Sequence, residues 1–176
     1  MQVSDKDLAI AAAQGDGQAF ATLAERHYDS IFRIAFRFSG RREEAEDLTQ
    51  DIFAVLPAGL AKFDARARFT TWLYRVIYNA ALDRRRRAAA YARAAEGWGE
   101  AEPARRAGEA ERRAARDWLS EAMTRLPQEL RDTAALVLDD ISHADAGEIL
   151  GVSEGTISWR MSQVRKHLSA LREQEL

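Results

Sequence analysis

The chain has 176 residues, of which 47% are hydrophobic, and this suffices for one domain or two small ones with buried cores. It has no cysteine, which excludes disulfides and thiolate metal sites, and its three histidines stand singly without ligand spacing, so we expect no metal and no cofactor. The net charge is −2, no apolar run reaches the roughly 18 residues of a membrane span, and no signal-peptide pattern opens the chain, so we expect a cytoplasmic protein without membrane insertion.

Helical spacing of apolar residues predicts three helices within the first part of the chain. The first covers about residues 5–14, and the second covers residues 18–38 and stops at Gly40. The third covers residues 41–56 and stops at Pro57. No segment of the chain keeps a two-residue alternation, so we expect no sheet.

The third helix has two different faces. Its apolar stripe is predicted to be buried and consists of Ala45, Leu48, Ile52, Val55 and Leu56. Its other face is predicted to be an exposed, mostly acidic ridge that consists of Glu43, Asp47, Gln50, Asp51 and Ala54. A charged helix face is usually only a solvated surface, so the ridge by itself does not indicate a partner.

A loop leads into a long fourth helix over residues 69–87. The apolar side of this helix is Phe69, Leu73, Val76, Ile77 and Ala80. The opposite side combines cations, an amide and an aromatic ring, and consists of Thr71, Arg75, Tyr78, Asn79, Leu82 and Arg86. Aromatic rings beside arginines favour single-stranded nucleic acid, because rings stack on bases and arginines follow phosphates. An amide can read a base edge through its paired donor and acceptor.

Residues 91–116 are rich in alanine, arginine, glutamate and glycine and have almost no large apolar side chains. That composition predicts a flexible linker. A second domain is predicted over residues 117–176, which carry eleven acidic and six basic side chains. Its first helices contain apolar residues that we expect in a small core sensitive to substitution at Leu126, Leu138 or Ile149.

Residues 141–168 predict a helix-turn-helix. Ser142 is expected to cap a helix that ends at Gly151, and Ser153 to cap the next one. The second helix has an apolar stripe that consists of Ile157, Met161, Val164, Leu168 and Leu171. Its opposite, polar face carries Trp159, which has no core to enter. An ordinary helical hairpin is the alternative, but the short glycine turn favours a helix that enters a DNA major groove.

The stretch from Gly147 to Leu168 resembles the C-terminal domain of bacterial sigma factors, particularly the small extracytoplasmic-function type. This resemblance implies binding to the minus-thirty-five promoter element. The implied duplex-contacting residues are Ser153, Thr156, Ser158, Trp159, Arg160, Gln163, Arg165 and Lys166. The usual pattern differs at Ala146, Gly147 and Trp159. The first two differences are expected to loosen the supporting helix.

The segment Asp47-Leu48-Thr49-Gln50-Asp51-Ile52-Phe53 is similar to the sigma-factor motif that docks on the clamp helices of the largest subunit of core RNA polymerase. For the chain as a whole, the family resemblance also implies contact with the polymerase flap. The resemblance implies a set of polymerase-binding residues on this helix. They are Asp47, Leu48, Gln50, Asp51 and Phe53. Asp51 stands where glutamate is usual, which keeps the charge but shortens its reach.

The fourth helix resembles the part of sigma factors that melts and reads the minus-ten promoter element. In that family the preceding loop captures a base flipped out of the stack. The residues implied for minus-ten binding are Phe63, Asp64, Arg66, Arg68, Arg75, Asn79 and Arg86.

We therefore expect an all-α protein of two small helical domains joined by a flexible linker, with the helix-turn-helix in the second domain. Residues 1–90 form the polymerase and minus-ten domain, 91–116 the linker and 117–176 the minus-thirty-five domain. The resemblance implies a sigma factor that directs promoter-specific initiation. Its expected partners are core RNA polymerase, promoter DNA in duplex and single-stranded form, and an anti-sigma factor.

Two other classes of protein stay open. A conventional helix-turn-helix transcription regulator would bind duplex DNA on its own. An enzyme is not expected, because the sequence has no glycine-rich phosphate loop, no nucleophile with its base and no metal-ligand spacing.

Overall fold

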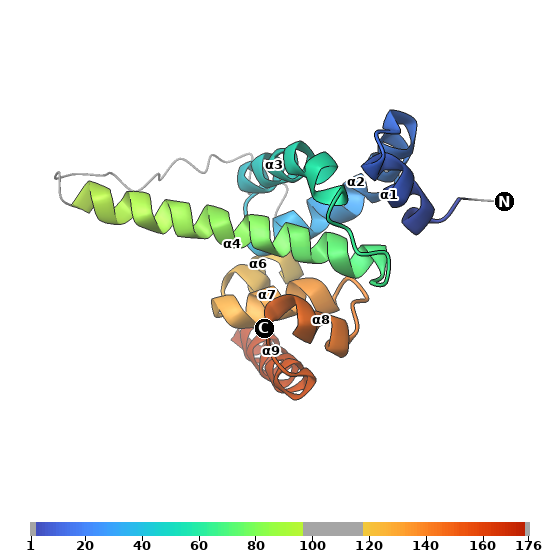
Figure 1. Ribbon diagram of the computed structural model, residues 1–176. Coiled ribbons are helices and arrows are strands. Elements are labelled where there is room, and N and C mark those ends of the chain that lie inside the picture. The colour runs from blue at the N-terminus through green and yellow to red at the C-terminus, as the bar shows by residue number, and fades with distance from the viewer. Residues whose placement is uncertain (1–2, 97–117, 175–176) are drawn as a thin grey trace.

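The structure is a computed structural model that describes residues 3–96 and 118–174. Within these ranges every regular element is a helix, which confirms the predicted all-α class. The helices are α1 (Asp5–Ala13), α2 (Gly17–Ser39), α3 (Arg42–Leu60), α4 (Phe69–Glu96), α6 (Trp118–Thr124), α7 (Gln128–Val137), α8 (His143–Leu150) and α9 (Glu154–Gln174). The long helix α4 runs between two groups, with α1, α2 and α3 on one side and α6 to α9 on the other (Figure 1).

The N-terminal half follows the predicted helices with small shifts of their ends. The side chain of Asp16 caps α2, and Gly40 ends it in the left-handed conformation with φ 74°. The expected stop of α3 at Pro57 is wrong, because the helix continues to Leu60. Leu56 and Leu60 are both buried, so packing of this last turn outweighs the hydrogen bond that a proline cannot donate.

Two of the predicted core residues lie at the surface. The side chain of Val55 is 52% exposed, and that of Leu138 is 39% exposed. Val55 precedes the buried Leu56 on the flank of the apolar stripe, while Leu138 follows the last residue of α7 and turns outward. Leu126 and Ile149 are buried as expected.

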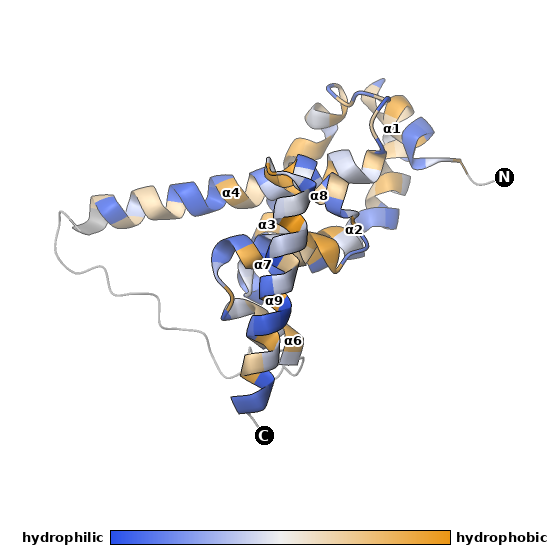
Figure 2. Cartoon of the chain, turned by 90° about the horizontal axis from the view of Figure 1, so that it is seen from below, coloured by the Kyte–Doolittle hydropathy of each residue, from blue (hydrophilic) through white to orange (hydrophobic). Residues whose placement is uncertain are grey.

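Helix α4 extends to Glu96 and therefore includes the first residues of the predicted linker. The rest of that linker prediction lies outside the described residues. Figure 2 shows hydrophilic and weakly hydrophobic residues alternating along the distal part of α4, and a hydrophilic C-terminal end of α9.

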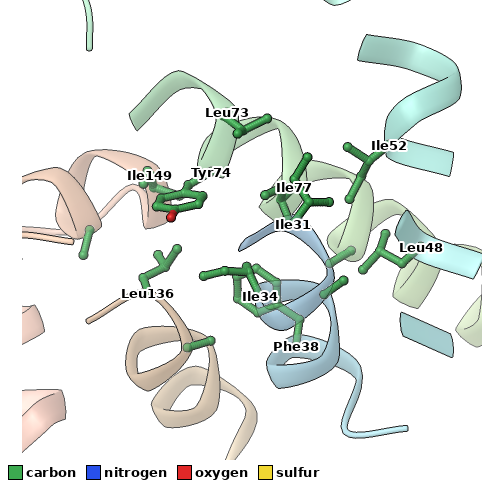
Figure 3. Close-up of a cluster of buried hydrophobic side chains, with 14 of the residues drawn as sticks. Ile31, Ile34, Phe38, Leu48, Ile52, Leu73, Tyr74, Ile77, Leu136 and Ile149 are labelled. Atoms are coloured by element: carbon green, nitrogen blue, oxygen red, sulfur yellow. The ribbon is translucent and has the colours of Figure 1, made fainter. Parts of the chain in front are cut away.

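The N-terminal and C-terminal halves share one continuous core, which the two-domain prediction did not include. Helix α2 packs on α7, and α4 packs on α8. Ile34 of α2, Tyr74 of α4 and Leu136 of α7 lie together in this core, and all three are at least 94% buried. Figure 3 shows side chains from both halves gathered around this point.

Candidate nucleic-acid and polymerase interfaces

Helices α8 and α9 form the predicted helix-turn-helix, with a very close approach at its turn. Ser142 caps α8 by accepting a hydrogen bond from the Asp145 N–H at 3.0 Å, and Gly151 ends it with φ 70°. The Val152 N–H donates to the Gly147 carbonyl at 3.0 Å. A Cβ atom on Gly147 would lie 2.7 Å from the Val152 carbonyl oxygen.

The expectation that Ala146 and Gly147 loosen the supporting helix is therefore wrong. Ala146 is fully buried, and a side chain at position 147 would collide with backbone. Glycine at this position permits a tight turn between the two helices.

The outward face of α9 carries most of the residues predicted for duplex contact. Trp159 is 60% exposed, and Ser158, Arg165 and Lys166 are also exposed. The apolar stripe faces inward as predicted, since Ile157, Met161 and Val164 are buried.

Other members of the predicted duplex set have partners within the C-terminal half. Ser153 caps α9 through the Thr156 N–H at 3.1 Å, and Gln163 is half-buried. Arg160 donates to Glu129 at 2.9 Å, and its side chain is only 13% exposed. Arg160 is thus held against α7, while Trp159 beside it points to solvent.

The predicted ridge on α3 is exposed throughout. Its polar members Asp47, Gln50 and Asp51 are called the α3 ridge below. One arginine of α4 contacts both of its carboxylates, because Arg84 donates to Asp51 at 2.7 Å and to Asp47 at 3.0 Å. Sequence spacing gave no sign of this contact, since Arg84 lies far along the chain from both aspartates.

The two apolar residues of the predicted polymerase motif differ in their surroundings. Leu48 is buried and packs in the core. Phe53 is half-buried and stacks with Tyr28, with ring centroids 5.7 Å apart. With Gln50, these two rings line an open hollow of about 540 Å³ between α2 and α3. This hollow adds an aromatic recess to the acidic α3 ridge.

In the loop before α4, one aromatic side chain packs against α4 and two arginine side chains are exposed to solvent. Phe63 makes edge contacts with Phe69 and Trp72, with centroids 5.8 and 5.4 Å away, so its ring anchors the loop. Asp64 accepts a hydrogen bond from the Arg66 N–H at 3.0 Å. The side chains of Arg66 and Arg68 are 93% and 79% exposed. They line an open hollow of about 400 Å³ beside the start of α4.

Along α4 the C-terminal half covers part of the predicted nucleic-acid face. Asn79 and Arg86 are exposed. Thr71, predicted on the open face, is instead buried and donates to Asp145 of α8 at 3.4 Å. Arg75 forms an ion pair with Glu148 of α8.

A buried carboxylate that sequence analysis missed joins the two halves. Asp139, just after α7, accepts hydrogen bonds from Arg33 at 2.6 Å, Arg37 at 3.1 Å and the Tyr74 hydroxyl at 2.6 Å. Its side chain is 6% exposed. We call these four residues the Asp139 cluster. A single aspartate in a charged segment carries no sequence signal for such a role, because its partners lie in distant helices.

The Asp139 cluster shifts the pKa values of its members. Burial disfavours the carboxylate, but hydrogen bonds from Arg33 and Tyr74 outweigh it and lower the pKa of Asp139. Burial and the hydrogen bond to Asp139 raise the pKa of Tyr74 far above its ordinary value. The cluster therefore holds a charged aspartate and a protonated tyrosine at neutral pH.

Within the described residues, no three histidine, aspartate or glutamate side chains gather as metal ligands. None of the described helices combines the length and apolar character needed to cross a membrane.

Comparison with known proteins gives consistent matches. The domain family Sigma-70 region 2 matches residues 23–91. The chain is 37% identical over 172 residues to the ECF RNA polymerase sigma factor SigM of Mycobacterium tuberculosis, which covers 96% of this chain and 84% of SigM. It is 29% identical over 173 residues to the ECF RNA polymerase sigma factor SigW of Bacillus subtilis, covering 92% and 91% of the two chains.

The fold also resembles solved structures. A structure of CnrH in complex with the cytosolic domain of CnrY superposes with a TM-score of 0.72 at 26% identity, covering 98% of this chain and 99% of CnrH. The sigma factor RpoE of Bartonella quintana, solved with the anti-sigma factor NepR, has a TM-score of 0.71 at 22% identity and covers 88% and 96% of the two chains.

Proposed function

This chain belongs to the extracytoplasmic-function (ECF) family of RNA polymerase sigma factors. We propose that separate surfaces of the chain bind core polymerase, the minus-ten element and the minus-thirty-five element during promoter-directed transcription initiation. The observation that carries the proposal is a helix-turn-helix with an exposed α9 face, in a chain whose other half matches sigma region 2. Promoter recognition is the task of this chain, and RNA synthesis is catalysed by core polymerase. The working units are residues 1–90 for polymerase and minus-ten DNA, 91–116 as the linker, and 117–176 for minus-thirty-five DNA.

Core polymerase docks on the α3 ridge and the neighbouring aromatic hollow. The exposure of Asp47, Gln50 and Asp51 supports this assignment, and so does the recess that Phe53 and Tyr28 line. Leu48 contributes from beneath by holding α3 on the core. Acidic side chains on one side of α3 and an aromatic recess on its other side, with Gln50 belonging to both, suit a partner surface that combines basic groups with an apolar projection.

The loop before α4 and the α4 face bind the minus-ten element as single strand. The exposed guanidinium groups of Arg66 and Arg68 are placed for phosphates. Their hollow at the start of α4 is the proposed site of base capture. Asp64, which accepts from the Arg66 N–H in the same loop, is the proposed acceptor for the base. Phe63 holds the loop in place, and Arg75, Asn79 and Arg86 continue the strand path along α4.

Helix α9 binds the minus-thirty-five element as duplex in the major groove. Arg165 and Lys166 contact phosphates, while Ser158, Gln163 and Trp159 face the bases. Ser153 and Thr156 lie at the N-terminus of α9, where backbone N–H groups favour a phosphate. Arg160 positions α9 through Glu129. Because residues 117–176 are acidic overall, binding to free duplex is weak and depends on polymerase to hold the chain on DNA.

An anti-sigma factor is a further proposed partner, and the cytoplasm is the proposed location, because core polymerase and promoter DNA are found there. The α3 ridge and the exposed Trp159 are the surfaces that such a partner would cover. Co-purification from uninduced cells tests this, and isolation of the chain without any stoichiometric partner would contradict it.

The deciding experiment is in vitro transcription from a genomic promoter library with bacterial core polymerase. Discrete start sites are expected with the wild-type chain and should be lost with Asp47→Arg/Asp51→Arg. The matched control is Glu25→Arg/Asp29→Arg, which reverses two exposed carboxylates on α2 at the same spacing. Thermal unfolding of both variants checks that the fold is kept.

Absence of transcripts from a chain that binds duplex DNA alone would favour the conventional regulator instead. Equal loss of transcription in both double variants would contradict the assignment of polymerase docking to the α3 ridge.

A further inference from the structure

Four arginine side chains line one recess of the structure. The recess has a volume of about 540 Å³ and is lined by residues of α2, α3, α4 and α7. Its arginines are Arg84, Arg85 and Arg87 of α4 and Arg131 of α7, and we call it the arginine recess. Among the described residues that line it, Glu44 supplies the only carboxylate, which pairs with Arg41 at 3.2 Å. The lining therefore carries a clear excess of positive charge.

Two of the four arginines are already neutralised by carboxylates. Arg84 donates to Asp47 and Asp51 of the α3 ridge. Arg85 binds Asp132 through two parallel hydrogen bonds of 2.8 and 2.9 Å. A guanidinium group has five N–H donors, so both side chains can still donate to a ligand. Their charges, however, are balanced within the protein.

The other two arginines have no carboxylate partner among the residues that the structure describes. Arg87 is exposed, whereas Arg131 is half-buried. Arg131 donates to two backbone carbonyl groups, that of Met123 at 2.9 Å and that of Thr124. These bonds fix the plane of its guanidinium group, while its Nη1 atom makes no hydrogen bond to the described chain. Arg87 and Arg131 are thus two uncompensated cations at one recess.

The surroundings of Arg131 favour an added anion. Burial lowers the pKa of its guanidinium group, and repulsion by Arg85 lowers it further, although the charge of Asp132 acts in the opposite direction. The cation is therefore less stable here than in water, and a ligand with negative charge would stabilise it. Because a second uncompensated cation lines the same recess, the best match is a ligand with several negative charges.

The inner wall of the recess is apolar. Phe38, Leu48 and Ala81 line it and are each at least 96% buried. An inorganic phosphate ion would leave this wall and most of the volume unused, since recesses of several hundred Å³ accommodate organic ligands. A flat ring system would cover the wall. Gln128, which also lines the recess, donates to Asp132 at 2.8 Å and retains its carbonyl oxygen as an acceptor for such a ring.

We propose that the arginine recess is a binding site for a nucleoside polyphosphate. The phosphates bind Arg87 and Arg131, because a guanidinium group matches phosphate oxygens through its paired N–H groups. The base covers the apolar wall. None of the described residues that line the recess belongs to the sets proposed for DNA contact. Lining by four helices also distinguishes it from an open helix face, which suits a continuous strand.

Calorimetric titration of the full chain with ATP and with GTP tests the site. The salt concentration is about 0.15 M, so that attraction between distant exposed charges is screened. One nucleotide per chain is expected. Inorganic tripolyphosphate should bind about tenfold more weakly because it leaves the apolar wall uncovered, and adenosine should not bind because it lacks phosphates. Absence of binding by both nucleotides would overturn the proposal, as would tripolyphosphate that binds as tightly as they do.

Two substitutions on different helices locate the phosphates. Arg87→Gln and Arg131→Gln should each weaken nucleotide binding about tenfold, because each removes a charged donor. The matched control is Arg93→Gln, which removes the same charge from exposed α4 surface outside the recess and should bind like wild type. Equal weakening by all three variants would indicate diffuse charge attraction and overturn the proposal.

The Arg87 variant also covers the case in which Arg131→Gln does not fold after losing its bonds to backbone carbonyl groups. Arg87 is exposed, so its substitution should leave the unfolding temperature unchanged while nucleotide binding weakens. Normal nucleotide binding by a folded Arg87→Gln would overturn the proposal.

A nucleic-acid strand is the other source of phosphates and bases. A fluorescein-labelled single strand of random sequence should bind the wild-type chain without displacing ATP, because the described lining residues lie outside the proposed DNA surfaces. Displacement of ATP by the strand, together with weaker strand binding by Arg87→Gln, would assign the recess to nucleic acid and overturn the proposal of a small ligand.

Discussion

At the scale of single residues, Asp139 is predicted to contribute strongly to stability. It is nearly buried and neutralises guanidinium groups from α2. We expect Asp139→Asn to lower the free energy of unfolding by about 2–3 kcal/mol at neutral pH, because charged donors lose their buried partner. Urea unfolding of both proteins measures this difference.

The same difference should depend on pH. The pKa of Asp139 in the folded chain lies below its ordinary value of 3.8, so its contribution is complete above about pH 4 and is lost as pH falls through the lower folded-state value. Wild type and Asp139→Asn should therefore converge in stability as pH falls below 3.8 and passes through the lower folded-state pKa of Asp139. A gap that stays constant over this range would show that the carboxylate charge is not its source.

Substitution of Trp159 is expected to change promoter recognition but not stability. Its ring is 60% exposed on α9, so Trp159→Ala should leave the unfolding temperature nearly unchanged. Loss of a base contact should weaken transcription from a promoter that requires its minus-thirty-five element by about tenfold. Tyr91→Ala is a suitable comparison, because Tyr91 is 78% exposed and lies outside the proposed DNA surfaces. A normal rate with Trp159→Ala would remove that residue from the DNA contact.

At the scale of elements, the turn between α8 and α9 depends on Gly147. Alanine normally favours a helix interior by about 1 kcal/mol over glycine. Here its Cβ would lie 2.7 Å from the Val152 carbonyl oxygen, so Gly147→Ala should destabilise the fold by about 1 kcal/mol or more. Gly155→Ala in α9 is the matched change, since its Cβ would meet only Ser153 Oγ at 3.8 Å. Thermal unfolding in which both variants gained stability would contradict this close packing.

Most of the helices could be predicted from the sequence because their signals are local. The caps at Ser142 and Ser153 and the left-handed Gly40 and Gly151 act within a few residues, and the structure confirms each. The end of α3 was mispredicted because burial of Leu60 is a tertiary effect, and tertiary packing overrides the local cost of Pro57.

At the scale of the whole molecule, the sequence did not predict that both halves share one core. Apolar periodicity identifies which face of a helix is buried but not which helix covers it. Thr71 illustrates this, since it lies on the polar face of α4 yet is buried by α8. The proposed nucleic-acid surface was predicted by residue type, whereas its partial cover by acidic side chains arises from contacts between distant segments.

The core that both halves of the chain share leads to a prediction about stability. Leu136 is fully buried where α7 meets α2, so Leu136→Ala should cost about 2–5 kcal/mol. Because the core is continuous, hydrogen exchange should accelerate in α2 and α4 as well as in α7. Acceleration confined to residues 118–174 would mean that the halves unfold independently.

The interface between α4 and α8 joins two parts of one polypeptide, so each half meets the other at an effective concentration on the order of millimolar. A contact between tethered segments does not depend on the concentration of the protein. Dilution of the chain should therefore leave the packing of α8 on α4 intact.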